Sequence, residues 1–166
     1  GWKKPPLRRS ATSLTVIDPE ANQTYPFEGT PNLPEQLYQL EVEAPSAGYP
    51  LSGIFLTHAH IGHYAGLMFL GHEAMGANNV PVYAMPRLYD FLQNNGPWSQ
   101  LVSYKNIDLM HLQNEKVESL GEIKVTPFLV PHRDEFSETV GYRISGPSKS
   151  ALFIPDINKW SEWKTN

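Results

Sequence analysis

The sequence contains no cysteine and no long run of apolar residues. Without thiols the chain can form no disulfide, no thiolate zinc site and no cysteine nucleophile. Its apolar runs are as short as 54–56, far below the length that spans a bilayer, and its first residues show no signal-peptide pattern. We therefore expect no association with a membrane, and these absences favour a cytoplasmic location.

An excess of positive charge is also missing. Thirteen Lys and Arg residues stand against seventeen Asp and Glu residues, which gives a formal net charge of −4 at pH 7. A duplex-binding protein normally presents a basic face, so nucleic acid is not an expected partner. Four of the thirteen basic residues lie within the first nine positions, and they predict a flexible basic tail over residues 1–12. The 166 residues predict a single domain over 1–166.

The apolar pattern predicts strands interleaved with helices. Strands are expected at 13–17, 24–27, 53–57, 80–84, 107–112, 122–129, 139–144 and 151–154, with turns at 18–22 and 48–52. Helices are expected at 33–40, 64–75 and 86–93, the second with Leu67, Leu70 and Met75 facing inward. Trp160 and Trp163 are expected to cover the core from a terminal helix. This order favours a layered α/β domain with a mixed sheet over an all-β sandwich.

Half of the six histidines fall within six residues, at His58, His60 and His63. Side chains two positions apart on an extended segment point the same way, so His58 and His60 can converge on one point. His63 lies about one helical turn beyond His60, at the start of the next predicted helix. Imidazole suits Zn²⁺, Fe²⁺ or Mn²⁺, and three protein ligands plus a water is the arrangement of catalytic zinc. The cluster predicts a metal site at the end of a buried strand.

Two further candidate ligands also follow strands. His132 comes after the predicted strand 122–129, and Asp156 comes after the strand 151–154. Because this repeats the placement of His58, we expect His132 and Asp156 to face the same metal. Acidic residues after His132 could take a proton instead, although a solvated acidic loop is the preferred interpretation; they are Asp134, Glu135 and Glu138. His72 is interpreted as the exposed side of a helix and His111 as a strand residue.

These residues together resemble a known family. The segment 57–63 resembles the HxHxDH signature of the metallo-β-lactamase-fold superfamily, His132 resembles the region of its third histidine, and Asp156 resembles its bridging aspartate. The segment 27–34 resembles the early motif in which the family usually carries Asp. Within the superfamily, the segments 83–86 and 95–99 are most similar to the coenzyme PQQ biosynthesis protein B branch.

The resemblance implies an αβ/βα sandwich with mixed sheets and a metal at the edge between them. It implies a first site of His58, His60 and His132 and a second site of His63 and Asp156. The chain departs from the family at Gly62, where the signature has the Asp that binds the second metal and orients the attacking water. The opening strand and the last metal-binding histidine have no counterpart, so we expect a fold incomplete at both ends, with an apparent truncation after residue 166. Glu28, in place of the early Asp, is interpreted as structural.

The leading functional hypothesis is a metal-dependent hydrolase that uses a metal-bound water or hydroxide on an ester, lactone, amide or phosphoester. Asp156 and His63 are the candidate catalytic residues, Asp156 to orient the water or take its proton. One zinc ion is expected, with a second weak or absent, and iron or manganese as alternatives. The expected partner is a small-molecule substrate; the oligomeric state is left open. Two alternatives remain, an iron-dependent hydroxylase similar to the PQQ branch and a metal-binding domain without turnover.

Overall fold

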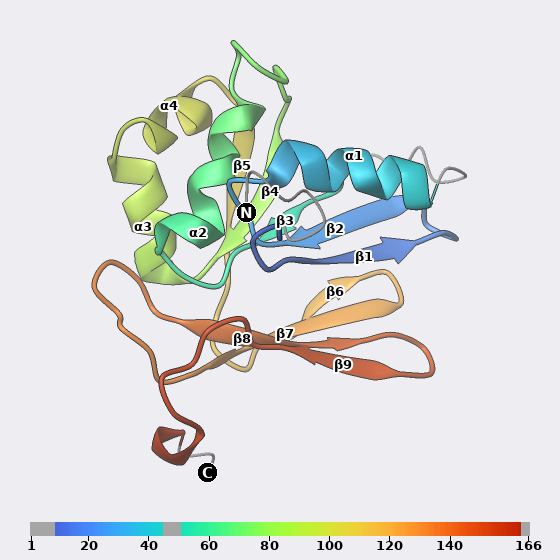
Figure 1. Ribbon diagram of the computed structural model, residues 1–166, viewed down its shortest axis with the longest axis vertical. Coiled ribbons are helices and arrows are strands. Elements are labelled where there is room, and N and C mark those ends of the chain that lie inside the picture. The colour runs from blue at the N-terminus through green and yellow to red at the C-terminus, as the bar shows by residue number, and fades with distance from the viewer. Residues whose placement is uncertain (1–8, 45–50, 164–166) are drawn as a thin grey trace.

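The computed structural model describes residues 9–44 and 51–163, which form two β-sheets packed face to face (Figure 1). The first sheet has the order β1-β2-β3-β4-β5, formed by Leu14–Asp18, Gln23–Phe27, Ile54–Phe55, Val80–Ala84 and Ile107–His111. Only β1 and β2 are antiparallel in it, and the other neighbours run parallel. The second sheet has the order β6-β7-β8-β9, formed by Glu118–Leu120, Ile123–Leu129, Val140–Ser145 and Ser150–Phe153, all antiparallel.

The helices lie on the face of the first sheet that points away from the second sheet (Figure 1). They are α1 (Leu33–Glu43), α2 (Ile61–Tyr64), the 3₁₀ helix η2 (Ala65–Leu70), α3 (Pro86–Asn94) and α4 (Trp98–Ser103). A short 3₁₀ helix, η3 (Trp160–Glu162), follows the second sheet. The described residues therefore form three layers: helices, mixed sheet and antiparallel sheet. No helix among them is long and apolar enough to cross a membrane.

A hydrophobic core lies between each pair of adjacent layers. Leu56, Leu67 and Leu88 belong to the core between the helices and the first sheet, and each is fully buried. Phe27, Phe55 and Tyr142 belong to the core between the two sheets. The central strands β2 and β3 are buried on both faces, as expected for strands of a parallel sheet covered on two sides. The two cores thus hold the C-terminal end of β3 rigidly, directly before His58.

One hydrogen bond across the sheets fixes this strand end further. The buried Tyr142 hydroxyl on β8 donates to the backbone carbonyl of Leu56. Burial raises the pKa of the Tyr142 hydroxyl well above its ordinary value, so the group remains a hydrogen-bond donor at all physiological pH values. The second sheet is therefore tied to the segment that leads into the histidine cluster.

The mixed α/β class is confirmed, and most predicted strands appear within one or two residues of their expected limits. The predicted helix 64–75 is wrong in its limits, because the helical turns begin at Ile61 and end at Leu70. Met75 consequently lies past the helix and is 52% exposed rather than inward. Helix α4 and strand β6 were not predicted. The basic tail to residue 8 and most of the predicted turn 48–52 lie outside the described residues.

The prediction for the terminal tryptophans is wrong for one of the two. Trp160 is 63% exposed, whereas Trp163 stacks on Phe128 of β7 with ring centroids 5.4 Å apart. The reason is that η3 is a single 3₁₀ turn that ends at Glu162, so Trp163 lies beyond it and the two tryptophans do not belong to one long buried helix face.

Candidate metal centre

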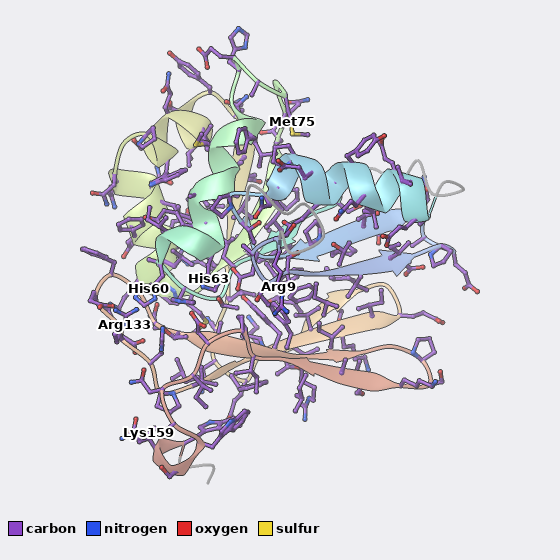
Figure 2. All side chains as sticks on the ribbon, viewed as in Figure 1. Arg9, His60, His63, Met75, Arg133 and Lys159 are labelled. Atoms are coloured by element: carbon purple, nitrogen blue, oxygen red, sulfur yellow. The ribbon has the colours of Figure 1, made fainter. Side chains whose placement is uncertain are left out.

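The histidine segment forms the connection between β3 and α2, at the edge between the two sheets. Its backbone is held from the second sheet, because Val140 N–H donates to Thr57 C=O at 3.2 Å and Ala59 N–H donates to Ser137 Oγ at 2.7 Å. Figure 2 shows His60 and His63 close together on the side of the molecule where α2 approaches the second sheet, with Arg133 of the facing loop nearby. Met75 lies at the far end of the helical layer in the same view.

Four predicted ligands meet at this edge. His58 Nε2 lies 2.9 Å from His60 Nδ1, and His60 Nδ1 lies 3.2 Å from His132 Nε2. Asp156 Oδ2 lies 3.4 Å from His58 Nε2 and 3.7 Å from His132 Nε2. One ligand atom from each of the four residues lies within 4.8 Å of every other. A tetrahedral ion with zinc–nitrogen bonds of 2.0–2.1 Å keeps its ligand atoms about 3.4 Å apart, so the spacing matches a single metal centre.

The second ring nitrogen of each histidine in this group contacts an oxygen atom. His58 Nδ1 lies 2.8 Å from Thr57 Oγ1, His60 Nε2 lies 2.9 Å from Glu135 Oε2, and His132 Nδ1 lies 3.0 Å from Asn158 Oδ1. A carboxylate and an amide oxygen only accept, so His60 and His132 donate outward and turn lone pairs inward. Two lone pairs directed at one point repel each other unless a cation lies between them. The donor set therefore fits a divalent metal ion.

Burial and neighbouring imidazoles keep His58 in the form that ligates metals. The side chain is 1% exposed, and this burial, followed by the charges of His63, His60 and His132, lowers the pKa of His58 to about 2. His58 is therefore neutral throughout the physiological pH range, with a ring nitrogen free to bind a metal.

His63 stands beside the four-residue group but outside it. Its Nε2 lies 3.1 Å from Asp156 Oδ2, and its Nδ1 lies 3.3 Å from Glu28 Oε1. Burial lowers the pKa of His63, but the carboxylates of Glu28 and Asp156 outweigh it and raise the pKa overall. His63 can therefore hold a proton between two acidic groups. Its role as a ligand of a second metal stays a prediction.

The loop after His132 is only partly the solvated acidic loop that the sequence indicated. Asp134 accepts from the Thr139 hydroxyl, and Glu138 accepts from the backbone N–H of Arg87 at the start of α3. Arg87 in turn donates to the carbonyl of Asp134 at 2.9 Å, which fastens the loop to α3. Glu135 alone of these three acids contacts the centre, and its hydrogen bond with His60 lowers its pKa. Interpreting all three as solvated missed this contact.

Several residues around the centre were not found as functional candidates. Glu28 was interpreted as structural only, and Thr57 and Asn158 were not considered. A charged residue directly after the apolar strand 23–27 was the available signal for Glu28, whereas Asn158 carries none. His72 is exposed in a turn, and His111 stacks on Tyr89 at 3.7 Å between ring centroids, so both lie outside the centre. At Gly62, an added Cβ would meet nothing within 4 Å.

The fold and this cluster define a class of proteins. Residues 26–165 match the family model described as a beta-lactamase superfamily domain, and the chain belongs to this superfamily. The metallo-β-lactamase fold expected from the resemblance is thereby confirmed, as is the mixed α/β class.

The individual proteins that the chain matches share little sequence identity with it. Ribonuclease Z of Gloeothece citriformis is 26% identical over 158 residues, which are 93% of this chain and 47% of that protein. Among solved structures, Zn²⁺-bound PqqB from Methylobacterium extorquens matches with a TM-score of 0.71 and 20% identity, over 90% of this chain and 54% of that one. A diphosphatase from the PhnP family matches with a TM-score of 0.60 and 21% identity, over 83% and 50%. The chain spans about half the length of these relatives.

Proposed function

We propose that this chain is a metal-dependent hydrolase whose ion is held by His58, His60 and His132, with Asp156 at the same centre. The observation that supports the proposal most is the convergence of three imidazole nitrogens and one carboxylate oxygen, all within 4.8 Å of one another, with each imidazole contacting an oxygen on its other side. A divalent cation in such a site supplies Lewis-acid chemistry: it polarises a substrate oxygen and makes water a better nucleophile. Zinc is the first choice, because histidine and carboxylate are its usual ligands in catalytic sites.

The chain's own residues supply the proton chemistry. Asp156 is 38% exposed, so a substrate and a water can reach its carboxylate from solvent. Its Oδ2 is also within 3.1 Å of His63 Nε2, which gives a proton taken by Asp156 a second group to move to. Glu135 and Asn158 hold the His60 and His132 rings in place.

The proposed substrate is a small molecule with an ester, lactone, amide or phosphoester bond. The net charge of −4 disfavours a nucleic-acid substrate, although ribonuclease Z is among the relatives. We propose to strip the protein with a chelator, reload it with Zn²⁺, and assay it on one model substrate of each class and on a single-stranded RNA. Zinc-dependent hydrolysis of one small substrate, lost in His132→Ala, is the expected result. Cleavage of RNA alone would overturn the choice of substrate, and inactivity on every substrate would favour a metal-binding domain without turnover.

A second candidate function is iron-dependent hydroxylation. Two observations favour it: Gly62 removes the Asp that orients water in the family, and PqqB is among the structural neighbours. Anaerobic reconstitution with Fe²⁺ followed by measurement of oxygen consumption separates the two chemistries. Oxygen uptake that depends on an added substrate would support the hydroxylase, and its absence together with zinc-dependent hydrolysis would exclude it.

A further inference from the structure

Glu28 is a fully buried carboxyl group on an unusual backbone. It follows β2 directly, its side chain is 0% exposed, and its φ angle is +92°, a region that residues other than glycine rarely adopt. Burying an acidic group and bending the backbone both cost free energy, so such a residue persists only where its surroundings hold it in place. Its backbone N–H donates to Phe55 C=O at 2.8 Å, which fixes it beside the end of β3.

A single oxygen of this carboxyl group faces both halves of the metal centre. Glu28 Oε1 accepts the hydrogen bond of the Thr57 hydroxyl and lies 3.3 Å from His63 Nδ1. Glu28 Oε2 has no hydrogen-bond partner among the described residues. Oε1 therefore accepts from the Thr57 hydroxyl, whereas His63 Nδ1 lies at ion-pair distance from it and has no hydrogen-bond partner among the described residues.

The single hydrogen of the Thr57 hydroxyl extends the influence of Glu28 to His58. A threonine hydroxyl has one hydrogen, and Thr57 gives it to Glu28. Thr57 Oγ1 can then only accept from His58 Nδ1, which is 2.8 Å away. With its hydrogen on Nδ1, neutral His58 has a lone pair on Nε2, and Nε2 is the atom that faces His60 and Asp156.

We infer that Glu28 is a positioning residue for two histidines: through Thr57 it sets the tautomer of His58, and through the 3.3 Å contact with Nδ1 it orients the ring of His63. The inference rests on the proposed metal centre for its functional meaning, and it goes beyond a purely structural role for Glu28. Partners of this kind behind a ligand histidine contribute about 10–100-fold to metal affinity. The same carboxyl group thereby links the three-histidine group to the His63–Asp156 pair.

The first test uses the metal-free wild-type protein and does not depend on metal binding. Long-range ¹⁵N–¹H NMR spectra of the imidazole rings report which ring nitrogen carries the hydrogen. We expect His58 to be the Nδ1–H tautomer and His63 to carry a hydrogen on Nδ1. An Nε2–H tautomer at His58 would overturn the inference, even if the protein binds zinc.

The second test uses variants to separate the effect of Glu28 on His58 from its effect on His63. Thr57→Val removes the hydroxyl and should change the tautomer of His58 alone, whereas Glu28→Met removes the acceptor and should change both histidines. Zinc affinity, measured by competition with a chelator, should fall about 10–100-fold in each. Glu28→Gln retains an acceptor oxygen at the same length and should restore most of the affinity.

Thr24→Val is the matched control, because Thr24 is also a buried threonine of this sheet region but its hydroxyl has no partner among the described residues. Zinc affinities of Thr57→Val and Glu28→Met within twofold of the Thr24→Val value would overturn the inference. If the wild type shows the expected tautomers and takes up no zinc, the proposed metal centre fails and the positioning by Glu28 stands.

Discussion

At the scale of single residues, a substitution of Asp156 can distinguish the proposed catalysis from metal binding. Its Oδ2 lies within 3.7 Å of three histidines, yet the side chain is 38% exposed. Asp156→Asn keeps the shape and removes the proton acceptor. Since general-base catalysis contributes about 10²–10⁴-fold, kcat should fall by about that factor, while the three histidines still hold about one zinc per chain.

The matched control for this substitution is Asp134→Asn, which changes an acid of the neighbouring loop that contacts Thr139 and not the histidines. For both variants, steady-state assays measure kcat and elemental analysis measures the zinc content per chain. Wild-type turnover in Asp156→Asn would contradict the catalytic role, and loss of zinc there would mean that the carboxylate acts mainly as a ligand.

The metal-free protein should lose stability in acid because of His58. The folded pKa of about 2 lies below the ordinary 6.5 of the unfolded chain, so the unfolded state binds one more proton as pH falls below 6.5. From pH 8 to pH 5 this single group should cost about 2 kcal/mol of unfolding free energy. Urea titrations across this range, with chelator present, should show a shallower pH dependence for His58→Gln than for the wild type.

His72→Gln is the control for this prediction, because His72 is exposed and lies outside the centre. Its stability curve should follow that of the wild type. Parallel curves for the wild type and His58→Gln would mean that burial does not hold His58 neutral.

Gly62 accounts at the residue scale for the expectation of one metal rather than two. The family resemblance places an Asp there that binds the second ion, and the structure leaves open space around the Cβ position. Gly62→Asp should therefore fold and raise the zinc content from about one toward two per chain, measured by elemental analysis at fixed free zinc. Gly146→Asp, in the exposed β8–β9 turn, adds the same charge away from the centre and should leave the zinc content unchanged.

Sequence alone could find the four residues that converge, and the reason is geometric. His58, His132 and Asp156 each follow a strand, and strand direction fixes where the next side chain points. The residues that orient the histidines could not be found in this way. Glu135 contacts His60 from 75 positions away, and Asn158 contacts His132 from 26 positions away, so both contacts depend on how the loops pack.

At the scale of elements, the loop between β7 and β8 holds the histidine segment. Ser137, which is 2% exposed, accepts from the backbone N–H of Ala59 between His58 and His60. Ser137→Ala leaves that N–H without this buried partner, and such a loss costs about 1–3 kcal/mol. Urea unfolding should show a decrease of this size, and zinc should bind more weakly because the segment is less fixed.

Ser148→Ala in the exposed turn after β8 is the control and should change neither quantity. An unfolding free energy within 0.5 kcal/mol of the wild type in Ser137→Ala, roughly the spread of ordinary surface substitutions, would mean that the loop does not support the segment.

The elements also show where sequence patterns fail. The apolar spacing of Leu67 and Leu70 correctly predicted two buried side chains, but it extended the helix to Met75. Gly66 explains the compact helical segment: an added Cβ would lie 1.8 Å from the Thr30 carbonyl oxygen, so η2 packs directly against the backbone after β2. Such an approach depends on tertiary packing, which local periodicity does not encode.

At the scale of the whole molecule, the two sheets bring together segments that are far apart in sequence. The first sheet supplies His58, His60 and Glu28, and the second supplies His132 and Asp156, so the centre exists only when the sheets pack. The buried Tyr142–Leu56 hydrogen bond and the edge-to-face contact of Phe27 with Tyr142, with ring centroids 5.2 Å apart, hold that arrangement from within the shared core. The candidate metal centre is thus a property of the folded domain as a whole.

Zinc content per chain tests the metal centre most directly. The purified protein is dialysed against a small excess of Zn²⁺, then against metal-free buffer, and analysed for metal beside His58→Ala, His60→Ala and His72→Ala. We expect about one zinc in the wild type and in His72→Ala, and almost none in the other two variants. Undiminished zinc in His58→Ala and His60→Ala, or no zinc in a folded wild type, would contradict a centre formed by His58, His60, His132 and Asp156.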